Sequence, residues 1–464
     1  MRLGSPRRAA LALAAASLCT TVPCGAAAAV KLTRLATVSG SVGPVFGMVR
    51  TGDGELHLVY PTVISPESGL TGLTISPSGA TGAPVSVLTT DWQTNLPGLV
   101  ELPGGTLETF FGGASPASFN PPSLATMWGL TSADGGATWS TPEDVRSGPN
   151  ENLAYGSALT AQVSGTTPVL TVPQAGNLVI QSGLGAGVPT YVASTSTDGS
   201  VGTVDSALDA GTGAVVAAWQ SLAGSGGDYI EQVAPTPGTP ELVPGKVLPE
   251  QLVVGRDSGP GVFAPYTTDG THVRLLRYGG GTVAVGRASG VTAAALGVAT
   301  GIDGRIWVMW GADGGRVAVT RSNKAVTRFE PIQVIETHAL TLFRLAGDGR
   351  LGPFDLLVDQ IADTTPLLPA GLYHARVLPE LSASVAVTVI KNKKTHVITS
   401  YKLKVTVTDA GDAVPGATVS VAGHTKKTGA TGAAKLALPG SSPSKLKLTA
   451  TAPSYRVLTR KVRL

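Results

Sequence analysis

Cysteine is scarce in this chain of 464 residues, which has only Cys19 and Cys24. Both lie within residues 1–29, which read as a signal peptide: arginines at the start, an apolar run over 9–19 and small residues at 27–29. We therefore predict a secreted, extracellular mature chain with no disulfide bond and no thiolate metal site. Arg7 and Arg8 leave a twin-arginine export route open beside the general one.

Long apolar runs and charged residues are also few. After the signal peptide, no apolar run reaches the roughly 18 residues of a membrane-spanning helix, so no transmembrane segment is expected. Charged residues make up 14% of the chain, but the hydrophobic share of 42% excludes a disordered protein. Sixty glycines and 33 prolines, beside abundant valine and threonine, predict many short strands joined by tight turns.

The sequence motifs of metal, cofactor and common catalytic sites are missing. The six histidines lie apart from one another and lack the spacing of metal ligands. There is no calcium-binding aspartate ladder, no phosphate loop and no Gly-x-Ser-x-Gly elbow with a histidine partner. We therefore predict no metal, no cofactor and no catalytic residue.

A repeated unit is present instead. Each copy has an apolar strand, a Gly/Asp turn and a second strand that ends in a large apolar residue, as in 49–60, 100–111 and 298–310. The turn glycines, about 49 residues apart on average, are Gly54, Gly105, Gly165, Gly213, Gly259, Gly304 and Gly349. A four-stranded blade with its loops needs about this length. The sequence therefore predicts an all-β fold with a seven-bladed β-propeller over 30–380; six blades is the alternative.

The last copy of the unit supplies only three strands, at 339–345, 351–358 and 371–377. We expect residues 31–38 to provide its missing outer strand. Pairing strands from the two ends of the propeller would close the ring and remove an exposed sheet edge.

One turn has a more specific pattern, with Ser132, Asp134, Gly136, Thr138 and Trp139 at fixed offsets between two strand-like runs. We expect the Ser132 and Asp134 oxygens to accept turn amides, Gly136 to take a positive φ, and Trp139 to pack over a neighbouring strand. The pattern resembles the Asp-box of sialidase-like β-propellers. Weaker copies are predicted at 78–82 and 196–199.

The resemblance implies the sialidase site, which has an arginine triad, a tyrosine nucleophile with a glutamate, an aspartate acid/base and a Phe-Arg-Ile-Pro motif. This chain has no Arg-Ile-Pro. The arginines on predicted strands are interpreted as surface or strand-edge residues: Arg34, Arg50, Arg344 and Arg376. We therefore expect a non-catalytic propeller, with a divergent sialidase-like glycoside hydrolase as the alternative.

The expected strand order of a propeller places the remaining polar residues on one or the other of its two faces. First and third turns lie on one face of a propeller, so five aspartates are expected to be turn formers far from any site: Asp53, Asp209, Asp257, Asp303 and Asp348. Loops of the opposite face carry the candidate ligand-binding residues Asp91, Trp92, Asn95, Asn150, Glu151 and Tyr155. Aromatic rings beside amides and carboxylates suit sugar binding. Trp219 and Trp310 are expected to pack between blades.

The end of the chain differs in charge. Residues 383–464 hold 11 lysines and 3 arginines against Asp409 and Asp412, a net charge of +12, whereas residues 30–382 have a net charge of −11. Residues 381–400 are predicted to be a linker and leading strand, in which 381–384 is the linker. In 401–464, apolar residues alternate with polar ones, as in Leu403, Val405 and Val407. Together with Pro415, Gly416 and Tyr455, this region resembles the carboxypeptidase regulatory-like domain, an Ig-like or prealbumin-like β-sandwich.

We expect the lysines to form a solvated face, to retain the protein on an anionic envelope polymer, or to dock onto the acidic propeller. Nucleic acid is not expected, because no aromatic residues are interleaved with the basic ones. The sequence thus favours a monomeric secreted propeller that binds glycan, envelope polymer or protein at the cell envelope, with the basic sandwich as anchor or spacer. A purely structural envelope component is a further alternative.

Overall fold

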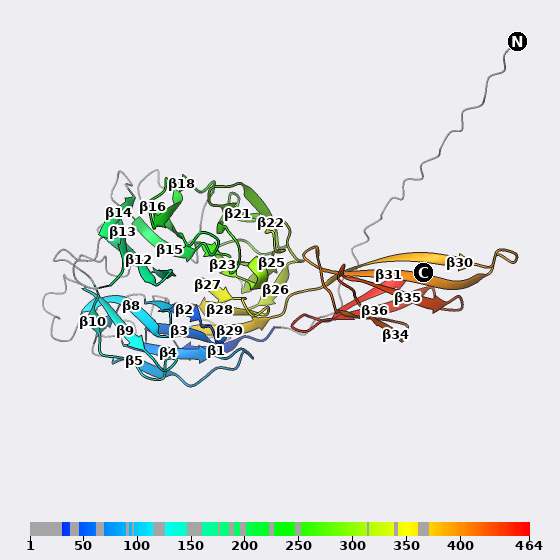
Figure 1. The fold of residues 1–464 in the computed structure, drawn as a ribbon, viewed down its shortest axis with the longest axis horizontal. Coiled ribbons are helices and arrows are strands. Elements are labelled where there is room, and N and C mark those ends of the chain that lie inside the picture. The colour runs from blue at the N-terminus through cyan, green and yellow to red at the C-terminus, as the bar shows by residue number, and fades with distance from the viewer. Residues whose placement is uncertain are drawn as a thin grey trace, which may run out of the picture.

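The computed structural model describes residues 30–37, 46–61, 69–89, 92–94, 97–114, 126–145, 160–174, 177–184, 190–194, 201–221, 227–245, 252–312, 315–337, 342–360 and 371–464. Within them, the named strands pair in antiparallel sheets, and the helical content is one 3-10 turn, η2 (Ile302–Gly304) (Figure 1). The predicted all-β fold is confirmed. These residues contain no helix with the length and apolarity needed to cross a membrane.

Seven sheets lie between residues 33 and 377 of the described chain, and all but the seventh are built from consecutive strands. The first holds β2 (Gly47–Arg50), β3 (Leu56–Pro61), β4 (Leu70–Ile75) and β5 (Val85–Leu88). The second holds β6 (Gln93–Thr94), β7 (Gly98–Glu101), β8 (Leu107–Ala114), β9 (Thr126–Ser132) and β10 (Glu143–Asp144). The third holds β11 (Thr160–Ser164), β12 (Thr167–Gln174), β13 (Asn177–Ser182) and β14 (Thr190–Ser194).

The next four sheets repeat the arrangement. The fourth holds β15 (Val201–Leu208), β16 (Val215–Ser221), β17 (Asp228–Ala234) and β18 (Glu241–Leu242). The fifth holds β19 (Val254–Gly255), β20 (Val262–Thr267), β21 (Val273–Arg277) and β22 (Thr282–Gly286). The sixth holds β23 (Ala295–Thr300), β24 (Ile306–Ala312), β25 (Arg316–Arg321) and β26 (Gln333–Glu336). The seventh holds β27 (Leu342–Asp348), β28 (Phe354–Gln360), β29 (Gly371–Val377) and β1 (Thr33–Thr37).

The seventh sheet joins the two ends of this part of the chain. β1 pairs antiparallel with β29, and Thr33 lies opposite His374 and Thr37 opposite Gly371. The expected outer strand from the N-terminal run is confirmed. Its pairing satisfies the hydrogen-bonding edge that β29 would otherwise expose.

The seven sheets pack in a closed cycle, which we call the ring. Each sheet shares a buried apolar cluster with the next, and the seventh shares one with the first, where Leu58 of β3 meets Leu357 of β28. Trp307 of the sixth sheet stacks on Phe354 of the seventh with ring centroids 4.9 Å apart. Trp219 and Trp310 are fully buried in two of these clusters, so their expected packing between sheets is confirmed.

The first strands of neighbouring sheets approach one another closely. A Cβ atom added to Gly47 of β2 would lie 2.8 Å from the backbone of Gly98 in β7. One added to Gly297 of β23 would lie 2.7 Å from the carbonyl oxygen of Leu345 in β27. Glycine is needed here because the sheets converge at their first strands and leave no room for a side chain.

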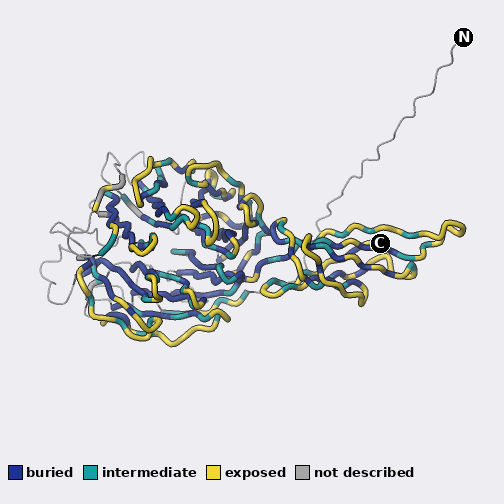
Figure 2. The backbone as a smooth tube through the Cα atoms, in the orientation of Figure 1, coloured by how far each residue is buried: buried dark blue, intermediate teal, exposed yellow. Residues whose placement is uncertain are grey.

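The last 83 residues, 382–464, form an arm of two further sheets, which projects from the ring (Figures 1 and 2). One holds β30 (Ser382–Lys391), β31 (Ile398–Asp409), β32 (Asp412–Ala413) and β35 (Ala433–Pro439). The other holds β33 (Thr418–Val421), β34 (His424–Lys427), β36 (Lys445–Thr451) and β37 (Leu458–Arg463). Their inner faces share one apolar core, to which Leu403, Val405 and Val407 belong. β30 begins within the expected linker, and Leu381 is buried in the same core.

The joint between ring and arm is made of buried polar groups. Asp409, at the end of β31, accepts hydrogen bonds from Arg321 Nη2 of the sixth sheet (2.6 Å) and from the Tyr455 hydroxyl of the arm (2.7 Å). Arg321 is 1% exposed, and its guanidinium lies 5.4 Å from the ring centroids of both Trp307 and Tyr455. These contacts fix the base of the arm against the sixth sheet.

A second arginine holds the neighbouring turn of the arm. Arg305 Nη2 lies 2.8 Å from Asp412 and 3.3 Å from Asp409, and Asp412 also accepts the Lys324 amide at 2.9 Å. Both acidic residues of the arm, Asp409 and Asp412, therefore pair with arginines of the ring. All 11 lysines of the arm are exposed. The expectation that the lysines dock onto the ring is wrong, because the charges at the joint have the opposite arrangement.

Glu330 is a further buried acidic side chain at this joint. Its carboxyl accepts Arg321 Nε at 3.1 Å and the Glu380 amide at 3.0 Å, and burial raises the pKa of Glu330 well above its ordinary value. Burial also acts to raise the pKa of Asp409, but the hydrogen bond from Glu330 and the charges of Arg321 and Arg305 outweigh it and hold that pKa below its ordinary value.

Candidate functional site

The arm docks at the end of the ring that carries the first turns of the sheets. There, Asp209 accepts the Gly211 amide of its own turn (2.9 Å) and the Gly261 amide of the next sheet (3.1 Å). Asp257 likewise accepts the amides of Asp303 (3.0 Å) and Gly304 in the following sheet. The expected role as a turn former is confirmed for Asp209, whereas the backbone amides that Asp257 accepts belong to the next sheet. Both aspartates tie adjacent sheets together, which the sequence did not indicate.

The turn over 132–139 connects β9 and β10. Ser132 Oγ accepts the Gly136 amide (2.8 Å) and Asp134 Oδ1 accepts the Thr138 amide (2.9 Å), as predicted. The Thr138 hydroxyl donates to Asp134 Oδ2 at 2.6 Å; this hydrogen bond, with those from the Thr138 amide and Ser132, lowers the pKa of Asp134 to about 2. Gly136 has φ of 87°. The carboxylate therefore organises the turn.

Two other turns repeat parts of this hydrogen bonding. In the first sheet, Ser76 Oγ accepts the Ala80 amide (3.1 Å) and contacts the Ser78 hydroxyl (2.8 Å). Ser76 therefore corresponds to Ser132, so this copy begins at residue 76 and not at the expected residue 78. In the sixth sheet, Asn323 Oδ1 accepts the Thr327 amide at 2.8 Å, a copy that the sequence analysis missed.

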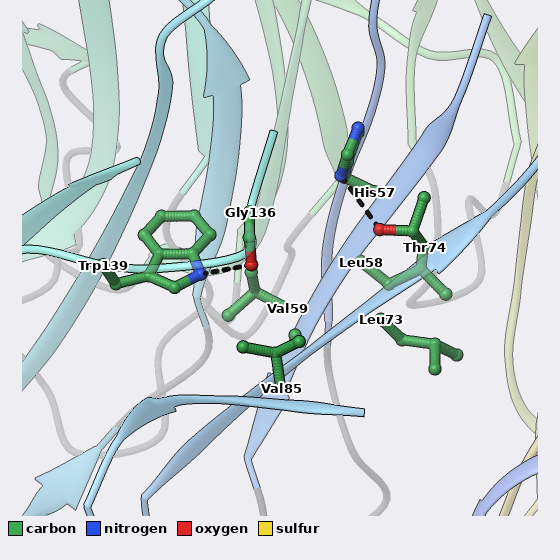
Figure 3. Close-up of a pocket in the computed structure, with 9 residues that line it drawn as sticks. His57, Leu58, Val59, Leu73, Thr74, Val85, Gly136 and Trp139 are labelled. Atoms are coloured by element: carbon green, nitrogen blue, oxygen red, sulfur yellow. Dashed lines mark hydrogen bonds between the residues drawn. The ribbon is translucent and has the colours of Figure 1, made fainter. Parts of the chain in front are cut away.

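A small cavity lies where this turn meets the first sheet (Figure 3). Trp139 and Gly136 form one wall, and His57, Val59 and Val85 of the first sheet form the other. The cavity encloses about 10 Å³, the space of at most one water molecule. It is therefore a packing gap between sheets, at the end of the ring that the arm also uses.

The predicted ligand-binding residues lie largely outside the described residues; these are Asp91, Asn95, Asn150, Glu151 and Tyr155. Trp92 is described and half-buried. Its ring packs edge-on against Trp128 at 5.1 Å and Phe111 at 6.0 Å, in the cluster between the first and second sheets.

The four strand arginines do not converge on one point. Arg50 and Arg376 both approach Asp355 of β28, at 2.6 Å and 3.7 Å, and Arg50 also contacts Asp348. Burial acts to raise the pKa of Asp355, but the hydrogen bond from His374 and the charge of Arg50 lower it overall. Arg50 is 4% exposed, so this network closes the seam between the first and seventh sheets.

Arg344 differs from the other arginines because it faces the middle of the ring. It lies on the first strand of the seventh sheet, and its charge lowers the pKa of Asp205 on the first strand of the fourth sheet. Two sheets separate these strands on one side and three on the other, so the interaction crosses the ring. Asp359 of β28 lies directly opposite Arg344 in the strand register. We call Asp205, Arg344 and Asp359 the axial cluster.

Arg344 is the accessible cation of this cluster. It is half-buried, donates to the Phe46 carbonyl at 3.3 Å and covers the Phe46 ring at 4.8 Å. Because Arg344 is near the start of β27, whose other end leads to the first turn, it lies towards the end of the ring opposite the arm. An arginine in this position can bind a carboxylate or phosphate that enters from that end.

The two carboxyls of the axial cluster have raised pKa values. Burial raises the pKa of Asp205 to about 6, although the charge of Arg344 and the amides of Ser206 and Val253 act to lower it. Burial also raises the pKa of Asp359, which is fully buried, well above its ordinary value. Among the described residues, no side chain forms a hydrogen bond with the Asp359 carboxyl. Both carboxyls of the axial cluster thus hold their protons more tightly than an ordinary aspartate does.

The sequence analysis singled out Arg344 only as a strand arginine and missed both carboxyls. The sequence does contain a pattern that could have indicated both carboxyls: Asp205 interrupts an alternating strand, and Asp359 ends the apolar run 356–358. The described residues hold no group of three or more histidine, aspartate or glutamate side chains placed to bind a metal ion.

No protein-family model and no curated protein matches this chain. Among solved structures, it is similar to the BP39L lectin from Burkholderia pseudomallei, with a TM-score of 0.48 and 14% identity over 75% of this chain and 99% of the lectin. It is also similar to the NanB sialidase from Streptococcus pneumoniae (TM-score 0.44, 8% identity, 73% and 68% of the two chains). A third is the intramolecular trans-sialidase from Ruminococcus gnavus (0.43, 9%, 72% and 94%). At these TM-scores and identities, no fold, ligand or reaction is carried over from these proteins to this chain.

Proposed function

We propose that residues 30–380 form a seven-bladed β-propeller whose 132–139 turn is an Asp-box, and that residues 401–464 form an Ig-like accessory domain. The cyclic packing of seven sheets and the pairing of β1 with β29 support the propeller. The hydrogen bonds of Ser132 and Asp134 support the Asp-box, and two sheets around one core support the Ig-like domain.

We further propose that this is a secreted, monomeric, non-catalytic protein that binds a glycan at the cell envelope, with the basic arm as its anchor. One observation carries the proposal: Arg344 is half-buried on the first strand of its sheet, and its charge acts on Asp205 of the first strand of a distant sheet. A single arginine beside carboxyls is suited to holding an acidic group of a ligand. The loops with Asp91, Trp92, Asn95, Asn150, Glu151 and Tyr155 then supply further contacts.

Glycan-array binding by the mature protein tests this proposal. We expect binding to be lost with Arg344→Met and kept with Arg274→Met, which removes an exposed arginine on β21. Absence of any ligand for the wild-type protein on glycan arrays and in pull-downs would reject the proposal. Equal loss with both variants would reject the role of the axial cluster.

A divergent glycoside hydrolase is the second candidate, because two carboxyls of raised pKa flank Arg344. Glycoside hydrolysis requires one protonated and one ionised carboxyl near the scissile bond. The check is release of fluorophore from aryl glycosides by the wild-type protein, abolished by Asp205→Asn. No release from a panel of such glycosides excludes this candidate.

A further inference from the structure

The lysines of the arm have no acidic neighbour within the arm, whereas Arg456 at its base pairs with Glu380 at 2.9 Å. The acidic side chains of the arm, Asp409 and Asp412, are both engaged at the joint with Arg321 and Arg305. All 11 lysines of the arm are exposed, and no acidic residue remains along its length to neutralise them. The arm therefore presents an uncompensated positive surface.

Four of these cations lie together on the outer face of the sheet formed by β33, β34, β36 and β37. Lys445 lies directly opposite Arg463, and Lys447 directly opposite Lys461. They face outward because their neighbours along β36, Leu446 and Leu448, are buried in the core. We call Lys445, Lys447, Lys461 and Arg463 the cationic face.

The cationic face has a regular geometry that folding does not require. Opposite residues of a sheet are about 5 Å apart, and alternate residues of one strand are about 7 Å apart. Like charges placed directly opposite each other destabilise a sheet. Threonines continue the ladder, because Thr449 lies opposite Thr459 and both have exposed surface. The arrangement suits a linear ligand with acidic groups about 7 Å apart and hydroxyls between them.

The arm offers no surface for stacking nucleobases. Its aromatic residues are Tyr401, which is buried in the core, and Tyr455, which is held in the joint. Proteins that bind single-stranded nucleic acid combine basic grooves with exposed aromatic rings. The chemistry of the cationic face therefore favours an acidic polysaccharide or polyol phosphate over a nucleic acid.

We propose that the cationic face is the binding site for a linear anionic envelope glycan whose carboxylate or phosphodiester groups pair with Lys445, Lys447, Lys461 and Arg463. This rests on the proposed role of the arm as an anchor, and it names the surface and the ligand chemistry. Lysine ammonium groups pair with either anion as point charges, so the two sources share one mode of binding.

A charge-matched pair of triple variants tests the site. One is Lys445→Gln, Lys447→Gln, Lys461→Gln; the other is Lys402→Gln, Lys404→Gln, Lys435→Gln, which removes three exposed lysines from the outer face of the other arm sheet. The full mature chain is titrated with polygalacturonate, with poly(glycerol phosphate), with dextran and with a single-stranded oligonucleotide. Thermal midpoints show that both variants fold, and that of the cationic-face variant is expected to be no lower than that of the wild type.

We expect the cationic-face variant to bind at least one acidic polymer about tenfold or more weakly, and the matched variant to lose less than about threefold. Wild-type binding should weaken steeply with added salt and be absent with dextran. The preferred polymer identifies the acidic group. Equal loss with both variants, tighter binding of the oligonucleotide than of either polymer, or no polymer binding by the wild type would overturn the proposal.

Attachment to isolated cell envelopes separates this inference from the anchor function. If the wild type and the cationic-face variant attach equally, the site is wrong and the anchor role stands. If the wild type binds an acidic polymer but no envelope, the anchor role is wrong and the site stands. Attachment lost only with the cationic-face variant supports both.

Discussion

Asp409→Asn is expected to weaken the joint between ring and arm. The Asp409 carboxylate is fully buried and faces Arg321 at 2.6 Å and Arg305 at 3.3 Å. Asparagine keeps the shape but removes the charge, so the buried Arg321 guanidinium loses its nearest anion, whereas Arg305 keeps Asp412. Breaking a buried ion pair from one side costs about 3–5 kcal/mol. We expect the free energy of unfolding to fall by about that amount.

Asp412→Asn is the matched control at the same joint. The Asp412 side chain is 28% exposed, and an asparagine oxygen can still accept the Lys324 amide that lies 2.9 Å away. An ion pair with this exposure contributes about 1 kcal/mol or less. The two variants should therefore differ by about 3 kcal/mol, more than a hundredfold in the unfolding equilibrium.

Urea denaturation followed by tryptophan fluorescence measures this difference. All six tryptophans lie in the ring, and Trp307 lies beside Arg321 at the joint. The pKa of Asp409 is lowered, so its contribution is present above the ordinary pKa near 4 and is lost as the pH falls through its lower native value. Equal losses for the two variants at pH 7, or an Asp409→Asn protein as stable as wild type, would refute the reasoning.

Four further predictions address the ring. Burial raises the pKa of Glu231 to about 7. The contribution of the Glu231 carboxyl to folding stability is therefore present below pH ~4.5 and is lost as the pH rises through 7. In urea titrations, Glu231→Gln should stabilise the protein by about 3 kcal/mol more at pH 8 than at pH 4. Gly47→Ala should destabilise by about 1–3 kcal/mol because its Cβ meets the Gly98 backbone, whereas Gly281→Ala, with no atom within 4 Å, should change stability by less than about 0.5 kcal/mol. Deleting residues 30–37 exposes the edge of β29 and should cause concentration-dependent association in light scattering; a monodisperse product would count against ring closure by β1. Arg344→Met should raise the pKa of Asp205 above 6 in carboxyl-carbon NMR titrations, and an unchanged value would place Arg344 away from the axis.

The sequence predicted features whose cause is local. The 132–139 turn could be predicted because its hydrogen bonds are local: Ser132 and Asp134 each accept the amide of the residue four positions later, Gly136 and Thr138. The outer strand from residues 31–38 could be predicted because the last repeat lacks one strand. In the structure, β1 supplies that strand. The copy of the turn at Asn323 was missed because asparagine replaces aspartate and no tryptophan follows.

The candidate site was predicted less well. Five of the six proposed ligand-binding residues lie outside the described residues, and Trp92 packs against Trp128 and Phe111. The axial cluster was not predicted, since a strand pattern does not say which strands face one another across a ring. Docking of the tail lysines onto the ring, one of the three roles considered for them, is wrong, because net charge does not locate Asp409 and Asp412.

By itself, the order of amino acids determined the strands, the tight turns, the repeat and the imbalance of charge, because each depends on neighbours along the chain or on composition. Only the tertiary structure decided which groups meet: Arg50 with Asp348, 298 residues away, Arg344 with Asp205 across the ring, and Arg321 with Asp409 of the arm. The physical reason is that closing the ring and seating the arm bring distant charges together, and those that become buried, such as Arg50 and Arg321, must find a partner.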